Sequence, residues 1–114
     1  SSKDNIMSHR ITTKTEIKDK AIAIKACQAS GWQYNERGES LFITSGPMKG
    51  ADVNFRTGEI GGDSDYVSRG DLGALSQPYA EAGLRDYAQK SGITISSRTV
   101  ESNGDVVLKC KRFT

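Results

Sequence analysis

The stretch from Met7 to Tyr34, MSHRITTKTEIKDKAIAIKACQASGWQY, predicts a strand, a helix and the start of a second strand. Residues 9–18 alternate between apolar or β-branched and charged side chains, which is typical of a half-buried strand. Asp19 follows at the N-cap position of a predicted helix over residues 20–30, where its carboxylate can accept from free backbone N–H groups. Gly31 then supplies the stop, because glycine adopts the left-handed conformation at little cost.

The rest of the chain predicts further short strands, a second helix and a closing hairpin. The strands are expected over residues 32–35, 41–44, 51–56 and 59–60, followed by an irregular stretch over residues 61–69. A short turn of helix over residues 71–75 precedes a helix that starts with Ser76 as cap and ends at Gly92, with Ala80, Leu84, Tyr87 and Ala88 on its packed face. Asn103-Gly104 indicates a two-residue hairpin loop, which would place Val100 opposite Val107 and Arg98 opposite Lys109.

These elements predict an α+β fold in two layers. We expect one antiparallel sheet with both helices on one face, in the chain order β-α-β-β-β-β-α-β-β. Residues 7–114 would form a single domain, and residues 1–6 would be a cloning remnant or a disordered leader.

Composition narrows the classes of function. Sixteen basic and fourteen acidic residues give a net charge of +2, which by itself indicates neither a nucleic-acid nor a membrane partner. No apolar run approaches the ~20 residues that span a bilayer. Cys27 and Cys110 are expected to be buried free thiols rather than a disulfide, because no export signal is visible; a cytoplasmic location in a bacterial host cell follows as an expectation.

Few residues suggest chemistry, and each has an ordinary structural alternative. His9 could pair with Cys27 or Asp52 as a catalytic couple, or could simply begin a strand. One histidine and two distant cysteines do not provide a zinc site, and Asp63-Ser64-Asp65 lacks the glutamate that completes a calcium loop. We therefore expect no cofactor, no metal and no catalytic site.

Two surfaces remain as candidate sites. The candidate interaction surface consists of polar residues that the fold does not require: Ser8, His9, Lys14, Glu16, Asp52, Asp63, Asp65 and Tyr79. The candidate anion or nucleic-acid surface is the basic closing hairpin, with Arg98, Lys109 and Lys111 on one face and Arg112 next along the chain. The first surface favours a non-enzymatic interaction or regulatory protein, and the second a small-ligand or nucleic-acid binding module that uses the hairpin or the glycine-rich loop. A self-associating chain is a further alternative, through an exposed edge such as residues 41–44.

Short motifs in the same order run through nearly the whole chain from Met7: Met7-Ser8-His9, Lys14-Thr15-Glu16-Ile17, Asp19, Gly31-Trp32, Asp52-Val53-Asn54-Phe55, Gln77 with Tyr79-Ala80, Gly104 and Arg112-Phe113. In these the chain resembles a family of uncharacterised conserved proteins of cyanobacteria, algal chloroplast genomes and cyanophages, and it looks like a short phage-type member. Arg10, in place of an aromatic residue, and Pro78, inside the second helix, depart from the family pattern. The resemblance implies no catalytic residues. Members encoded near an AAA-type ATPase imply a regulatory or adaptor role with that ATPase as a partner.

Overall fold

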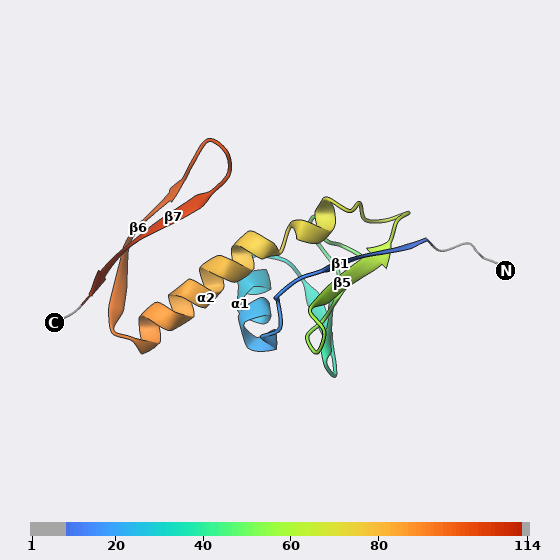
Figure 1. The fold of residues 1–114 in the computed structure, drawn as a ribbon, viewed down its shortest axis with the longest axis horizontal. Helices are drawn as coiled ribbons and strands as arrows, with labels where there is room; N and C mark the ends of the chain where they lie inside the picture. The colour runs from blue at the N-terminus through green and yellow to red at the C-terminus, as the bar shows by residue number, and fades with distance from the viewer. Residues whose placement is uncertain (1–8, 113–114) are drawn as a thin grey trace.

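A computed structural model describes residues 9–112, and these form an α+β fold with two α-helices and seven strands in two sheets (Figure 1). The elements follow the predicted chain order. They are β1 (Arg10–Lys14), α1 (Lys20–Ser30), β2 (Tyr34–Arg37), β3 (Ser40–Ile43), β4 (Ala51–Asn54), β5 (Glu59–Asp63), the 3-10 turn η1 (Asp71–Gly73), α2 (Ser76–Lys90), β6 (Ile93–Val100) and β7 (Val106–Arg112). Within the described residues no helix has both the length and the apolar content needed to cross a membrane.

The expectation of one continuous sheet is wrong. Strands β1 to β5 form an antiparallel sheet in the spatial order β1-β5-β4-β3-β2, whereas β6 and β7 form a separate two-stranded sheet. The length of α2 explains the separation, since its 15 residues span about 22 Å. Figure 1 shows α2 crossing α1 and running beyond the five-stranded sheet, so that the closing hairpin lies against α2 at the far end of an elongated molecule.

Helix α1 begins and ends where the sequence predicts. The Asp19 side chain accepts from the backbone N–H of Ile22 at 3.2 Å, which satisfies one of the free donors of the first turn. Gly31 has φ = 75°, and its N–H donates to Gln28 while Trp32 N–H donates to the Cys27 carbonyl. This αL ending closes the helix and turns the chain into β2.

The core lies between α1 and one face of the five-stranded sheet. Leu41, Val53 and Ile60 from neighbouring strands have no exposed surface, and neither has Ala23 or Cys27 on the helix. The buried residues of α1 other than Ile22 are small: Ala23, Ala26 and Cys27. The sides of this layer are closed by Met48, Val67, Leu72 and Leu75, which come from the loops and η1 rather than from the helices or strands.

The packed face of α2 differs from the predicted one. Of the four residues predicted on it, only Ala88 is buried; Ala80 is exposed, and Leu84 and Tyr87 are 40% and 57% exposed. Ala82, which was not predicted there, is buried. Small residues allow α2 to cross α1 at close range: a Cβ on Gly83 would lie 3.8 Å from the side chain of Ile22. Periodicity alone favoured the larger side chains, but the crossing requires the smaller ones. Ser76 is also not the cap, because Leu75 occupies the N-cap position and makes no side-chain bond.

The stretch expected to be irregular begins with an interior strand. Gly61, Gly62 and Asp63 continue β5, which pairs with β1 on one side and β4 on the other. Both glycines are buried, and a Cβ on Gly62 would meet the side chain of Val67 at 2.7 Å. The absence of side chains hides the period-two pattern in the sequence, yet it is what allows neighbouring groups to lie directly on the strand.

Candidate functional site

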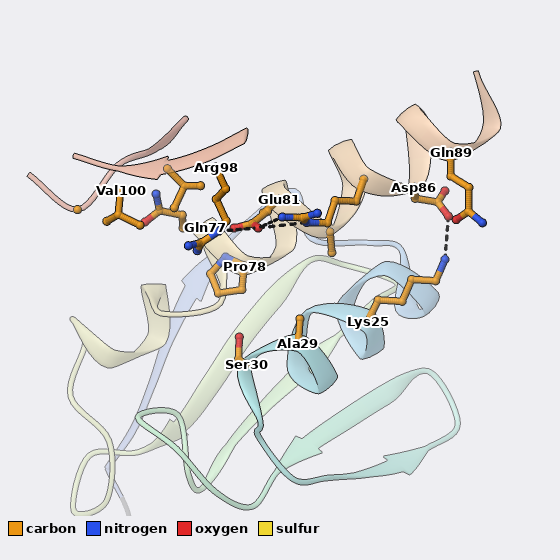
Figure 2. A pocket seen from close by; sticks show the side chains of 14 residues that line it. Lys25, Ala29, Ser30, Gln77, Pro78, Glu81, Asp86, Gln89, Arg98 and Val100 are labelled. Carbon is orange, nitrogen blue, oxygen red and sulfur yellow. Dashed lines mark hydrogen bonds and ion pairs between the residues drawn. The ribbon is translucent and has the colours of Figure 1, made fainter. Parts of the chain in front are cut away.

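A groove lies between α1, α2 and the β6–β7 hairpin, with a volume of about 860 Å³ (Figure 2). Helix α2 forms its floor with residues that include Pro78 and Ala82. Lys25, Ala29 and Ser30 of α1 form one wall, and Arg98, Val100, Gly104 and Val106 of the hairpin region form the other. We call this the interhelical groove. It is larger than a second groove, of about 360 Å³, that α2 and the hairpin form near Leu84 and Val107.

Glu81 on the floor holds the hairpin to α2. One oxygen of its carboxylate, Oε2, accepts from Arg98 Nε at 2.9 Å and from Arg85 at 2.9 and 3.1 Å. The Glu81 side chain is 17% exposed, and both guanidinium groups are about half exposed. Its bonds to Arg98 and Arg85, strongest from Arg98, hold the Glu81 pKa below its ordinary value. One carboxylate therefore serves two cations.

Asp86 makes the corresponding contact to α1. Its two oxygens accept from Lys25 at 2.8 Å and from Lys90 at 2.9 Å. The bond from Lys25 is the main cause that lowers the Asp86 pKa, and Lys90 adds to it. Figure 2 shows the Lys25–Asp86 contact bridging the two helices at one end of the groove and the Arg98–Glu81 contact at the other. Both carboxylates are committed to two cations each, so the charge that remains in the groove is positive.

The hairpin register differs by one residue from the predicted one. Val100 pairs with Val106 and Arg98 with Leu108, and a bulge at Ser96 shifts the register again toward the end. The cause is the loop. Glu101 N–H donates to the Asp105 carbonyl, and Gly104 N–H donates to the Glu101 carbonyl, with Gly104 at a positive φ of 91°. This three-residue loop replaces the two-residue one and moves every side chain of one strand to the other face.

The candidate anion surface is divided by this register. Arg98 shares a face with Leu108 and points to α2, whereas Lys109 pairs with Ser97 and lies on the opposite face with Lys111. The expected placement of the three cations on one face is therefore wrong. The backbone of Arg112 pairs with Ile93 at the end of the hairpin. Only Arg98 of this candidate surface lines the interhelical groove.

The residues of the candidate interaction surface do not meet in one place. Ser8 lies outside the described residues. Glu16 forms a 3.8 Å ion pair with Lys18 in the connection to α1, and Lys14 is exposed at the end of β1. The remaining members are distributed over the other end of the sheet and over α2: His9, Asp52, Asp63, Asp65 and Tyr79. The Tyr79 hydroxyl accepts from Asp19 N–H at 3.2 Å, which ties α2 to the start of α1.

Neither of the catalytic couples considered for His9, with Cys27 or with Asp52, is formed in the structure. Both oxygens of Asp52 bind the Arg10 guanidinium, at 2.9 and 3.0 Å. His9 is exposed, whereas Cys27 is fully buried and burial raises its pKa to about 11, so the two do not form a reactive couple. Cys110 is a free cysteine as expected, but it is exposed rather than buried. Among residues 9–112 no three His, Cys, Asp or Glu side chains gather as a metal site.

The groove residues Glu81, Arg85, Asp86 and Lys25 were not anticipated. Two of their contacts join residues four apart on α2, Glu81 with Arg85 and Asp86 with Lys90, and such pairs are visible in sequence. That spacing ordinarily marks a solvated helix face. It does not reveal that the same carboxylates also reach Arg98 and Lys25, since these lie on other elements.

Comparisons of the chain with protein-family models, with curated proteins and with solved structures find no match. The central features of its geometry are the interhelical groove and two carboxylates in it, Glu81 and Asp86, each of which binds two cations.

Proposed function

We propose that this protein is a small non-enzymatic interaction protein that binds a segment of a partner protein in the interhelical groove. The observation that carries the proposal is the composition of the groove. Exposed apolar surface, including Val100 at 56% exposure and Ala29, lies beside charged side chains that already have fixed positions. Apolar contact area with an ordered polar rim is typical of protein recognition sites.

The hairpin adds a second line of support. It is attached to α2 and projects from the molecule, leaving most of both strands exposed. A two-stranded sheet alone is of marginal stability in water, so a hairpin of this length gains from a partner that covers it. Val107 and Leu84, each 40% exposed, extend the uncovered apolar surface along the other side of the hairpin.

The resemblance described above supports a cyanobacterial or cyanophage setting for this interaction. It also makes an AAA-type ATPase the first partner to test. Neither proposal requires chemistry at the groove, because a regulatory or adaptor role depends only on binding.

The test is affinity capture from a cyanobacterial lysate with three forms of the full chain. Ala29→Trp fills the groove from α1, and Ala21→Trp is its matched control, since Ala21 is also an exposed alanine of α1 but does not line the groove. We expect the parent and Ala21→Trp to recover a partner in about stoichiometric amount and Ala29→Trp to lose it. Recovery of no stoichiometric partner, or equal recovery by Ala29→Trp, would contradict the proposal.

A further inference from the structure

We infer that the groove accepts an extended acidic segment, which pairs with the open edge of β6 and places alternate carboxylates toward Arg98, Arg85 and Lys25. This inference rests on the proposed function, since it names the kind of partner that the groove would bind. Three observations support it: the direction of the β6 backbone groups, the difference between β6 and the other strand edges, and the charge of the groove.

The backbone groups on the outer edge of β6 make no bond to β7. Glu101 N–H donates to the Asp105 carbonyl at 2.8 Å, so the next pair, Val100 with Val106, does not exchange backbone bonds. By alternation the N–H and C=O of Val100 and Arg98 are directed away from β7. These two residues are also the members of β6 that line the groove. The open edge of β6 is therefore formed by residues that also line the groove.

The other strand edges are protected, and β6 is not. Arg69 donates to the Thr12 carbonyl at 3.0 Å and so covers the outer edge of β1. Strand β2 is only four residues long, and β7 carries Lys109 and Lys111. Lysines and short strands are common devices against unwanted edge pairing. The β6 sequence, ITISSRTV, has neither lysine nor proline, and its single charged residue is held by Glu81.

The charge of the groove favours an acidic partner. Arg98 reaches Glu81 only through Nε, and a guanidinium has five N–H donors, so most of its donors are available to a second carboxylate. Lys25 and Arg85 are about half exposed beside the same floor. In an added strand every second side chain would share the face of Arg98 and point to this floor. The expected segment thus has Asp or Glu at alternate positions.

The experiment measures binding of a fluorescent peptide of about ten residues, alternating Thr and Glu, to the full chain by anisotropy. The comparison probes are the same peptide with Gln for Glu, two versions methylated on the backbone nitrogens of all Thr or all Glu residues, and an oligothymidylate of similar length. We expect the Gln peptide to bind at least tenfold more weakly. One methylated version should lose binding and the other keep it, because only alternate N–H groups of a strand face its neighbour.

Variants of the chain locate the peptide. Arg98→Gln should weaken binding roughly five- to tenfold, as expected for a partly exposed charge pair. Val100→Pro removes an N–H from the groove edge and should abolish binding. Leu108→Pro is the control, because it places a proline in the other strand of the same hairpin, at a residue that does not line the groove and whose N–H, opposite Arg98, faces the other edge. Melting curves confirm that each variant is folded, and the methylated peptides test edge pairing without altering the protein.

Equal binding of the Glu and Gln peptides, retention of binding by both methylated versions, or tighter binding of oligothymidylate would overturn the inference. So would capture of the lysate partner that depends on Ala29 but is unchanged by Arg98→Gln and Val100→Pro. That last result would leave the proposed function standing. Failure of the proposed function is a separate result, because it appears as capture of no stoichiometric partner or as capture that Ala29→Trp does not alter.

Discussion

Replacing Glu81 with Gln should release the hairpin from α2 while leaving the main core intact. The change keeps the size of the side chain but removes the charge that binds Arg98 and Arg85. Because both guanidinium groups are about half exposed, each ion pair contributes about 0.5–1 kcal/mol. Only the Arg98 pair joins the hairpin to α2, so the loss of hairpin stability should be about 0.5–1 kcal/mol. It should fall on the β6–β7 sheet, since no residue of that sheet belongs to the main core cluster.

Native-state hydrogen exchange of the backbone amides measures this loss element by element. We expect amides of β6 and β7 to exchange about 2- to 5-fold faster in Glu81→Gln, as a loss of about 0.5–1 kcal/mol implies, and those of β3 and β4 to be unchanged. Asp86→Asn is the matched control: it removes a carboxylate of the same helix that binds Lys25 and Lys90 instead of the hairpin. Unchanged hairpin exchange in Glu81→Gln, or equal acceleration in Asp86→Asn, would refute the reasoning.

The same two carboxylates predict how stability depends on pH. The folded-state pKa of Glu81 and of Asp86 is lowered by the cations that they bind. Their contribution is therefore present in full above the ordinary carboxyl pKa of about 4 and is lost as pH falls through the lowered value. The free energy of unfolding, measured by urea titration between neutral pH and about pH 3, should fall less steeply in Glu81→Gln than in the parent. Identical slopes would contradict the assigned ion pairs.

Three further outcomes test the fold. Gly31→Ala should lower the free energy of unfolding by only about 1–2 kcal/mol, the cost of its positive φ, because its Cβ would meet nothing within 4 Å. Gly58→Ala should lower stability clearly more in thermal melts, because its Cβ would lie 2.1 Å from the Thr15 carbonyl oxygen. Equal losses in the two variants would contradict this packing. Gly61→Ala would place a Cβ 2.6 Å from a guanidinium nitrogen of Arg10 and should displace that group from Asp52. The coupling free energy of the Arg10–Asp52 pair, measured by a double-mutant cycle, should therefore be smaller in the Gly61→Ala background. An unchanged coupling free energy would contradict the contact between Arg10 and Gly61. Cys110 should react with a thiol reagent in the native protein, and Cys27 only on unfolding. Because burial raises the Cys27 pKa to about 11, the contribution of its thiol to stability is lost as pH rises from about 9 through 11. Cys27→Ala should therefore reduce the fall in the free energy of unfolding, measured by urea titration, over that pH range.

Local signals allowed much of the five-stranded part to be predicted. The burial of Ala51, Val53 and Phe55 follows the alternation of their segment, because one face of β4 is against the core. The glycines of β5 were misread because a buried glycine strand has no alternating side chains, and its pairing is decided by β1 and β4. The candidate site was predicted least well: Arg98 was selected as one of a basic set, whereas its position depends on a bond to Glu81 from a different element.

The sequence alone determined the start and end of α1, since a capping carboxylate and an αL glycine act within a few residues of the chain. It also determined the α+β class and the order of the elements, which depend on local periodicity. Only the tertiary structure decided that the closing hairpin leaves the main sheet, which face of α2 is buried, and which hairpin face carries Arg98. These features depend on the length of one helix, on small residues at a crossing and on a single extra loop residue, and their consequences become visible only when distant elements pack together.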